Sequence, residues 1–188
     1  MTVQSEYQLE NELISQLKQL GYAAVTLKDE SQLLSNLKTQ IERANGLAPL
    51  SDTEWKQVIS FLNTGTVFER AKNLRDLFPV KFDDGSSKHL FFLSDEPSKN
   101  IYQVTNQITI DHRDYNGRTS RVDVTLLVNG LPLVQIELKK RGMEIAEAFN
   151  QTQRYIREAY WAGQGLFGFI QLFVISNGAN TRYYANGT

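Results

Sequence analysis

The 188-residue sequence contains no cysteine and only two histidines, His89 and His112. Disulfide bridges and thiolate metal sites are therefore excluded, and the histidines are too few for a Cys/His zinc site. Neither histidine has a partner visible in the sequence, so we assign them no role. Catalytic chemistry in this chain must use carboxylates, amines and hydroxyls.

An excess of charge of one sign is also lacking, because 20 Lys and Arg stand against 21 Asp and Glu. The chain has no overall basic field that would hold a polyanion or an acidic membrane, so nucleic-acid contact must come from a local patch or from a partner. Its start has no apolar signal segment, and its longest apolar-rich stretch, 165–175, is shorter than the ~18 residues of a membrane span. We expect a cytoplasmic protein that does not interact with membranes.

Hydrophobic periodicity and turn residues predict a mixed α/β fold in one domain, residues 1–188. Helices are predicted over Ser5–Gly21, Ser31–Asn45, Asp52–Asn63, Val67–Phe78 and Met143–Trp161. Strands are predicted over Tyr22–Leu27, His89–Leu93, Ile101–Ile110, Val122–Val128, Leu133–Lys140, Phe167–Ser176 and Thr181–Ala185. We expect the helices of 31–78 to form an insertion, 81–99 a surface excursion and 111–120 a polar loop. No terminal element follows the last strand, which suggests a fragment of a larger protein.

The predicted hairpin 122–140 has one dry face and one face that carries polar and ionisable side chains: Asp123, Thr125, Gln135, Glu137 and Lys139. The polar side chains of both strands lie on the same face of the hairpin only if the sequence numbers of two paired residues add up to an even number, as for Asp123 and Glu137. A plain two-residue turn at Asn129-Gly130 gives an odd sum. We therefore predict a three-residue loop or a β-bulge, with Gly130 in the left-handed conformation.

Two carboxylates on one face, Asp123 and Glu137, with Lys139 two residues further on, have the chemistry of a phosphodiester hydrolysis site. Carboxylate oxygens hold a hard divalent cation, while the ammonium polarises a water or phosphate beside it. The alternative is a surface ladder of ion pairs among the same three residues.

The sequence Asp123…Glu137-Leu138-Lys139 resembles the D…(D/E)-x-K core of the PD-(D/E)xK nuclease superfamily, with Val122 in place of the proline. That resemblance implies a restriction-endonuclease-like fold, in which a central mixed sheet is flanked by helices. It also implies that Asp123, Glu137 and the Leu138 carbonyl ligate Mg²⁺, and that Lys139 orients or deprotonates the attacking water.

Two flanking features agree with this resemblance. Glu10 stands eleven residues before Gly21, as does the metal-side glutamate on the first helix of archaeal Holliday-junction resolvases. It would contact water at the cation or a second cation; Glu6, one turn earlier, is the alternative. Gln151 and Tyr155 resemble the Q-xxx-Y motif of RecB-like members, which would steady DNA or the lysine.

Longer blocks, at 9–14, 21–22, 129–142, 147–151 and 172–178, are similar to the N-terminal endonuclease domain of the R (HsdR, motor) subunit of type I restriction enzymes. This implies a Mg²⁺-dependent endonuclease that cleaves double-stranded DNA together with the HsdM methyltransferase and HsdS specificity subunits. ATP would act only in motor domains outside this chain, because the sequence has no G-x-x-x-x-G-K-[ST] motif.

Other interpretations remain open from the sequence. Lys140 and Arg141 form either a phosphate-facing patch or a solvated strand end. The chain could be a stand-alone, resolvase-like nuclease that cuts structured DNA. It could also be a fragment that docks onto other subunits and has an incomplete site in isolation.

Overall fold

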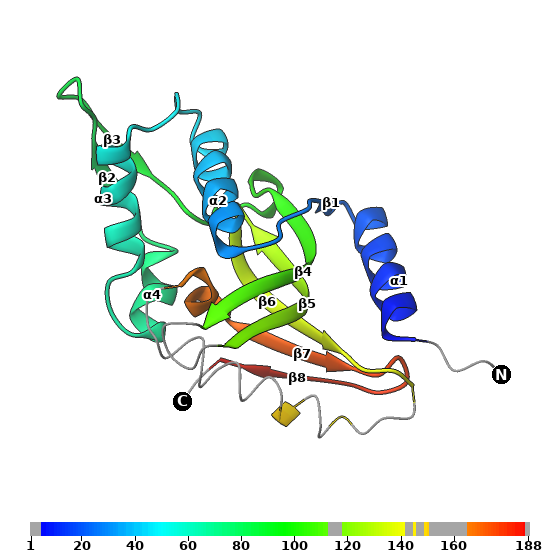
Figure 1. Ribbon diagram of the computed structural model, residues 1–188. Helices are drawn as coiled ribbons and strands as arrows, with labels where there is room; N and C mark the ends of the chain where they lie inside the picture. The colour runs from blue at the N-terminus through cyan, green and yellow to red at the C-terminus, as the bar shows by residue number, and fades with distance from the viewer. Residues whose placement is uncertain (1–4, 113–117, 142–144, 146–148, 151–164, 187–188) are drawn as a thin grey trace.

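The computed structural model describes residues 5–112, 118–141, 145, 149–150 and 165–186 (Figure 1). Its centre is a six-stranded mixed sheet in the order β1 (Ala23–Ala24), β4 (Tyr102–His112), β5 (Arg118–Val128), β6 (Leu131–Leu138), β7 (Leu172–Ser176) and β8 (Thr181–Ala185). The pairs β1–β4 and β6–β7 are parallel, and the other three are antiparallel. The expectation of a mixed sheet flanked by helices is confirmed.

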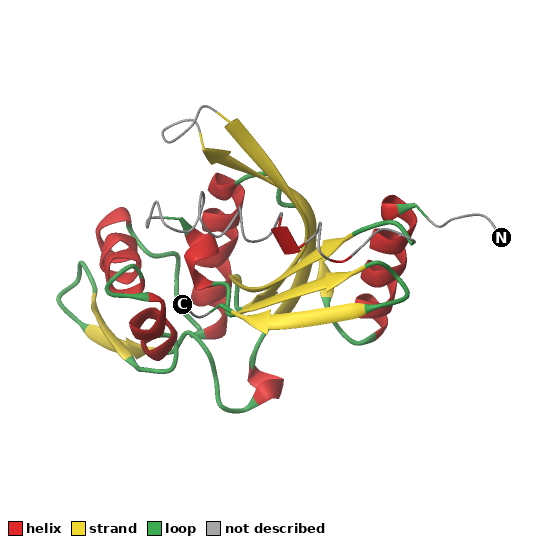
Figure 2. Ribbon diagram, turned by 90° about the horizontal axis from the view of Figure 1, so that it is seen from below, coloured by secondary structure: helices red, strands yellow, loops and turns green. Residues whose placement is uncertain are grey.

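Helix α1 (Glu6–Gln19) packs on one face of this sheet. It begins where predicted, because the Ser5 side chain accepts from the Gln8 backbone and the Gln8 side chain accepts from the Ser5 backbone in a capping box. The apolar cluster beneath α1 consists of the buried residues Leu17, Val104, Val124, Ile136 and Leu138. Figure 2 shows α1 set apart from the other helices, on its own side of the strands.

Helix α2 (Glu30–Ala44) belongs to the larger apolar cluster. Its residues Leu33, Leu37 and Ile41 are fully buried together with sheet residues such as Val122 and Phe173. The helices of 31–78 were expected to form an insertion. The apolar stripe of α2 forms part of the main core.

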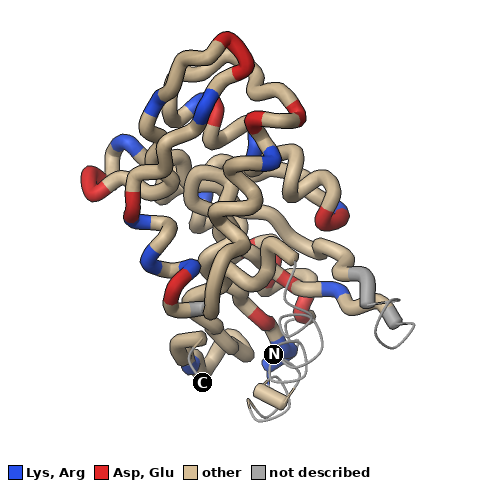
Figure 3. The backbone as a smooth tube through the Cα atoms, turned by 90° about the vertical axis from the view of Figure 1, so that its left-hand side faces the viewer, with Lys and Arg blue, Asp and Glu red and all other residues tan. Residues whose placement is uncertain are grey.

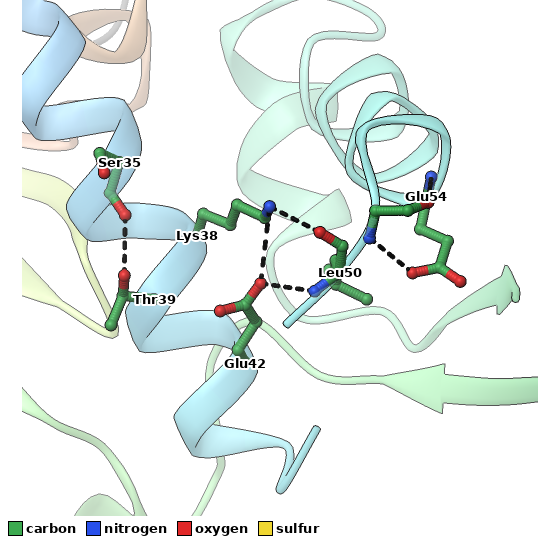
Figure 4. A network of polar contacts seen from close by, with 7 residues as sticks. Ser35, Lys38, Thr39, Glu42, Leu50 and Glu54 are labelled. Carbon is green, nitrogen blue, oxygen red and sulfur yellow. Dashed lines mark hydrogen bonds and ion pairs between the residues drawn. The ribbon is translucent and has the colours of Figure 1, made fainter. Parts of the chain in front are cut away.

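The segment that follows α2 is held by polar contacts with side chains of α2 (Figure 4). Lys38 Nζ donates to the Leu50 carbonyl over 2.6 Å, and Glu42 Oε1 accepts from the Leu50 N–H over 2.8 Å. Ser51 then caps α3 (Asp52–Leu62) in a capping box with Glu54. These contacts fix where the next helix begins.

Helix α3 lies beside a hairpin of β2 (Phe78–Lys81) and β3 (Ser87–Leu90), and α4 (Val67–Asn73) packs against α3. The predicted helix Val67–Phe78 was too long, because Phe78 pairs in the hairpin and stacks on Phe61 with ring centroids 4.5 Å apart. The predicted surface excursion 81–99, which ends in η1 (Pro97–Lys99), is also partly wrong. Its residues Leu90 and Phe92 are fully buried, so this segment closes one side of the core.

Other differences concern the ends of elements. Strand β1 is shorter than predicted, and β4 and β5 extend into the expected polar loop 111–120. The predicted strand Phe167–Ser176 is divided, because η3 (Leu166–Phe169) is a 3-10 helix and β7 starts only at Leu172. The predicted helix Met143–Trp161 lies almost entirely outside the described residues. No helix in the described part of the chain is long and apolar enough to cross a membrane.

Candidate active site

The β5–β6 hairpin turns on two residues, Asn129 and Gly130, whose φ angles are 50° and 82°. A register shift after two strand pairs brings Thr125 opposite Gln135, and the Thr125 hydroxyl donates to Gln135 Oε1 over 2.8 Å. The predicted bulge and left-handed Gly130 are confirmed, whereas the three-residue loop does not form. Because of the bulge, the polar faces of the two strands coincide.

The ladder between β5 and β6 ends at the pair Val124–Ile136. Beyond it, the Asp123 side chain takes the place of a strand partner, because its Oδ2 accepts from the Leu138 N–H over 2.7 Å. Strand β6 continues on its other side, where Glu137 pairs with Ile175 of β7. Asp123 and Glu137 therefore meet at the point where two strands separate.

Glu137 is fully buried, and Lys139 Nζ lies 3.5 Å from its Oε1. Burial, reinforced by the charge of Asp123, raises the pKa of Glu137 to about 8. The pKa of Asp123 is also raised, chiefly by burial, although the Leu138 N–H and Lys139 oppose the rise. Glu137 Oε2 is buried without a hydrogen-bond partner among the described residues, which is an unfavourable state for a carboxylate oxygen.

Glu10 of α1 is also buried, with 4% of its surface exposed. Its Oε2 accepts from Gln107 Nε2 over 2.6 Å, and its Oε1 accepts from Asn106 Nδ2. The charges of Glu10 and Glu6 both contribute to the raised pKa of Asp123, so both acids lie within electrostatic reach of Asp123. Glu6 is exposed and accepts from the Lys140 backbone N–H over 3.2 Å.

Four of the residues expected at the site, Asp123, Glu137, Lys139 and Glu10, thus interact near the point where β5 and β6 separate. Lys140 and Arg141 are exposed directly beyond β6, and Gln151 and Tyr155 lie outside the described residues. Sequence reasoning missed Asn106 and Gln107. The available signal was two consecutive amides in the middle of a strand in which they are flanked by β-branched residues.

The residues present suit a small divalent cation. No group of three or more His, Cys, Asp or Glu side chains that could hold a metal ion occurs within the described ranges. Two carboxylates and a backbone carbonyl are oxygen donors, and Mg²⁺ commonly takes few protein ligands and retains several waters. The unpartnered Glu137 Oε2 is an acceptor that such a cation would satisfy.

Figure 3 shows Lys and Arg positions interspersed with Asp and Glu positions along the backbone. This agrees with the near-zero net charge of the sequence. Electrostatic attraction of a polyanion by the whole domain is therefore weak.

Comparison with known proteins gives one family. The family described as the type I restriction enzyme R protein N terminus matches residues 3–188. The chain is 47% identical over 191 residues to the endonuclease subunit of type I restriction enzyme SauMSSORF170P of Staphylococcus aureus (strain MSSA476), covering 99% of the chain and 20% of that relative. It is 41% identical to the EcoprrI endonuclease subunit of Escherichia coli, covering 98% of the chain and 60% of that relative. The chain thus spans about one fifth of the length of the staphylococcal relative.

Proposed function

Because the chain belongs to the family of type I restriction enzyme R protein N termini, we propose that it is a Mg²⁺-dependent endonuclease domain that cleaves phosphodiester bonds of double-stranded DNA. The observation that carries this proposal is the pair of half-buried Asp123 and fully buried Glu137, with an unpartnered Glu137 oxygen and Lys139 beside it. A structural ion pair does not need an acceptor left unsatisfied in the protein interior. The mixed sheet flanked by helices is compatible with the PD-(D/E)xK fold, which we assign as part of this proposal.

We assign the roles from the contacts together with the resemblance to PD-(D/E)xK nucleases. Asp123, Glu137 and the Leu138 carbonyl hold Mg²⁺, which when bound neutralises charge that builds on the scissile phosphate. Lys139 Nζ lies 3.5 Å from Glu137 Oε1, and from this position its ammonium would orient the attacking water. Glu10 supplies a further acceptor close to Asp123.

Residues outside this centre complete the proposal. Lys140 and Arg141 contact DNA phosphates, because they are exposed immediately after β6. Gln151 and Tyr155 steady DNA or Lys139, as in the Q-xxx-Y motif that they resemble.

The relatives suggest the wider setting, since they are endonuclease subunits and the staphylococcal one is about five times longer than this chain. We propose that the domain works in the cytoplasm within a complex that also contains HsdM and HsdS. Domains outside this chain would translocate DNA at the expense of ATP, and another subunit would read the recognition sequence. Cleavage by the nuclease domain then needs no base-reading element of its own.

The test uses the complete restriction complex on a plasmid that carries its recognition sites. Asp123→Ala and Glu137→Ala should abolish Mg²⁺-dependent cleavage while ATP hydrolysis and DNA translocation continue. The surface variant Glu12→Ala, on the exposed side of α1, serves as a control and should cleave normally. Unchanged cleavage in either site variant would refute the assignment. Cleavage of Holliday junctions by the purified chain alone would support the stand-alone nuclease instead.

A further inference from the structure

Strand β4 contains a strained residue. Among the described non-glycine residues, only Gln107 and Asn129 have positive φ angles, 57° and 50°. Asn129 belongs to a hairpin turn, where this conformation is common. Gln107 lies in the middle of an eleven-residue strand, where the left-handed conformation is unfavourable and has to be imposed by the surroundings.

The strained residue lies opposite a proposed metal ligand. Strands β4 and β5 pair Asn106 with Val124 and Ile108 with Val122, and the position between them places Gln107 across from Asp123. That one pair is missing from an otherwise continuous ladder. The break in β4 therefore coincides with the point where Asp123 leaves its own strand pairing with β6.

The local conformation has a direct consequence for side chains. Consecutive residues of a regular strand point to opposite faces of the sheet, so Asn106 and Gln107 would normally diverge. Here both amides donate to Glu10, one to each carboxylate oxygen. The positive φ of Gln107 thus accompanies a convergence of two neighbouring amides on one buried acid.

We infer that Asn106 and Gln107 are positioning residues, which hold the buried Glu10 carboxylate beside Asp123 so that it takes part in binding the divalent cation. This inference rests on the proposed function. Each carboxylate oxygen retains acceptor capacity after one amide hydrogen bond, so Glu10 can still receive a water or a cation. Outer partners of this kind restrict the orientation of a ligand and thereby raise the affinity for the metal.

The experiment measures Mn²⁺ binding to the purified chain by calorimetry, so that its readout does not depend on cleavage. Gln107→Gly removes the amide and accepts the backbone conformation, and Asn106→Ala removes the other donor. Each should raise the dissociation constant about tenfold. Gln107→Asn, which tolerates positive φ but is shorter, should behave like the glycine variant and guards against misfolding. The control is Gln103→Ala on the same strand, because Gln103 is buried and bonds Asn36 rather than Glu10; it should leave the constant unchanged.

A double-mutant cycle separates positioning from general damage to the fold. In a Glu10→Gln background, Gln107→Gly should cause no further loss of affinity, because its effect passes through Glu10. An unaltered dissociation constant for Gln107→Gly, or losses that multiply in the double variant, would overturn the inference. If the inference fails in this way but Asp123→Ala abolishes Mn²⁺ binding, the proposed function still stands. If the unaltered chain does not bind Mn²⁺, both the proposed function and this inference are overturned.

Discussion

Replacing Glu137 by glutamine should stabilise the metal-free protein at alkaline pH while removing its response to Mg²⁺. The carboxyl pKa is 4.5 in its ordinary state and about 8 in the folded protein, so the folded state binds more protons than the unfolded state between these values. The free energy of unfolding therefore falls as the pH rises through this window. At ~1.4 kcal/mol per pKa unit, ionisation of Glu137 lowers the free energy of unfolding by at most about 5 kcal/mol.

Glutamine removes this charge but leaves a buried amide whose hydrogen bonds are incomplete, at a cost of about 1–3 kcal/mol. The expected net gain in the free energy of unfolding of Glu137→Gln is about 2 kcal/mol near pH 9. Near pH 5 the unaltered side chain is protonated in the folded protein, so the gain should disappear. Mg²⁺ should stabilise the unaltered chain at the higher pH, by mass action, and leave the variant unaffected.

The assay is urea unfolding of the purified chain at both pH values, with and without Mg²⁺. Glu12→Gln on the exposed surface of α1 is the matched control and should follow the unaltered chain under all four conditions. A Glu137→Gln variant that is less stable at alkaline pH, or that Mg²⁺ stabilises as much as the unaltered chain, would refute the reasoning.

Three further predictions concern catalysis, packing and DNA affinity. Lys139→Arg should slow single-turnover DNA cleavage by the complete complex about 100-fold, because a planar guanidinium cannot replace a compact ammonium in this nearly closed position; near-normal cleavage would leave Lys139 as an ion-pair partner only. Gly130→Ala should lower the free energy of unfolding in urea by about 3 kcal/mol, since a Cβ there lies 2.7 Å from the Leu37 backbone at a φ of 82°. Gly85→Ala, with a similar φ but open surroundings, should cost only about 1 kcal/mol, and equal losses in the two variants would contradict the packing argument. The isolated chain should bind DNA more weakly than about 1 µM at ~0.15 M salt and lose affinity as salt rises, so nanomolar binding in a titration would be the contrary result.

The sequence by itself determined features that depend on neighbouring residues. The helices that begin near Ser5 and Asp52 were predicted from the sequence, and they begin there because the Ser5 and Ser51 side chains accept from the backbone N–H three residues later. The left-handed Gly130 and the bulge followed from the requirement that the polar faces of two strands match. Asp123, Glu137 and Lys139 were predicted as site residues from their spacing on one face of an apolar hairpin and from their resemblance to a nuclease core.

Only the tertiary structure decided how these acids are held, because their partners come from distant parts of the chain. Glu10 accepts hydrogen bonds from the amides of Asn106 and Gln107, which lie 96 and 97 positions further along the chain. No local pattern encodes these contacts or the strained φ of Gln107. Helix α4 ends before Phe78 for a similar reason: its helical spacing favours continuation, but pairing with β3 and stacking on Phe61 outweigh that weak preference. The separation of β5 and β6, which leaves a buried oxygen of Glu137 without a partner, likewise exists only once the sheet is assembled.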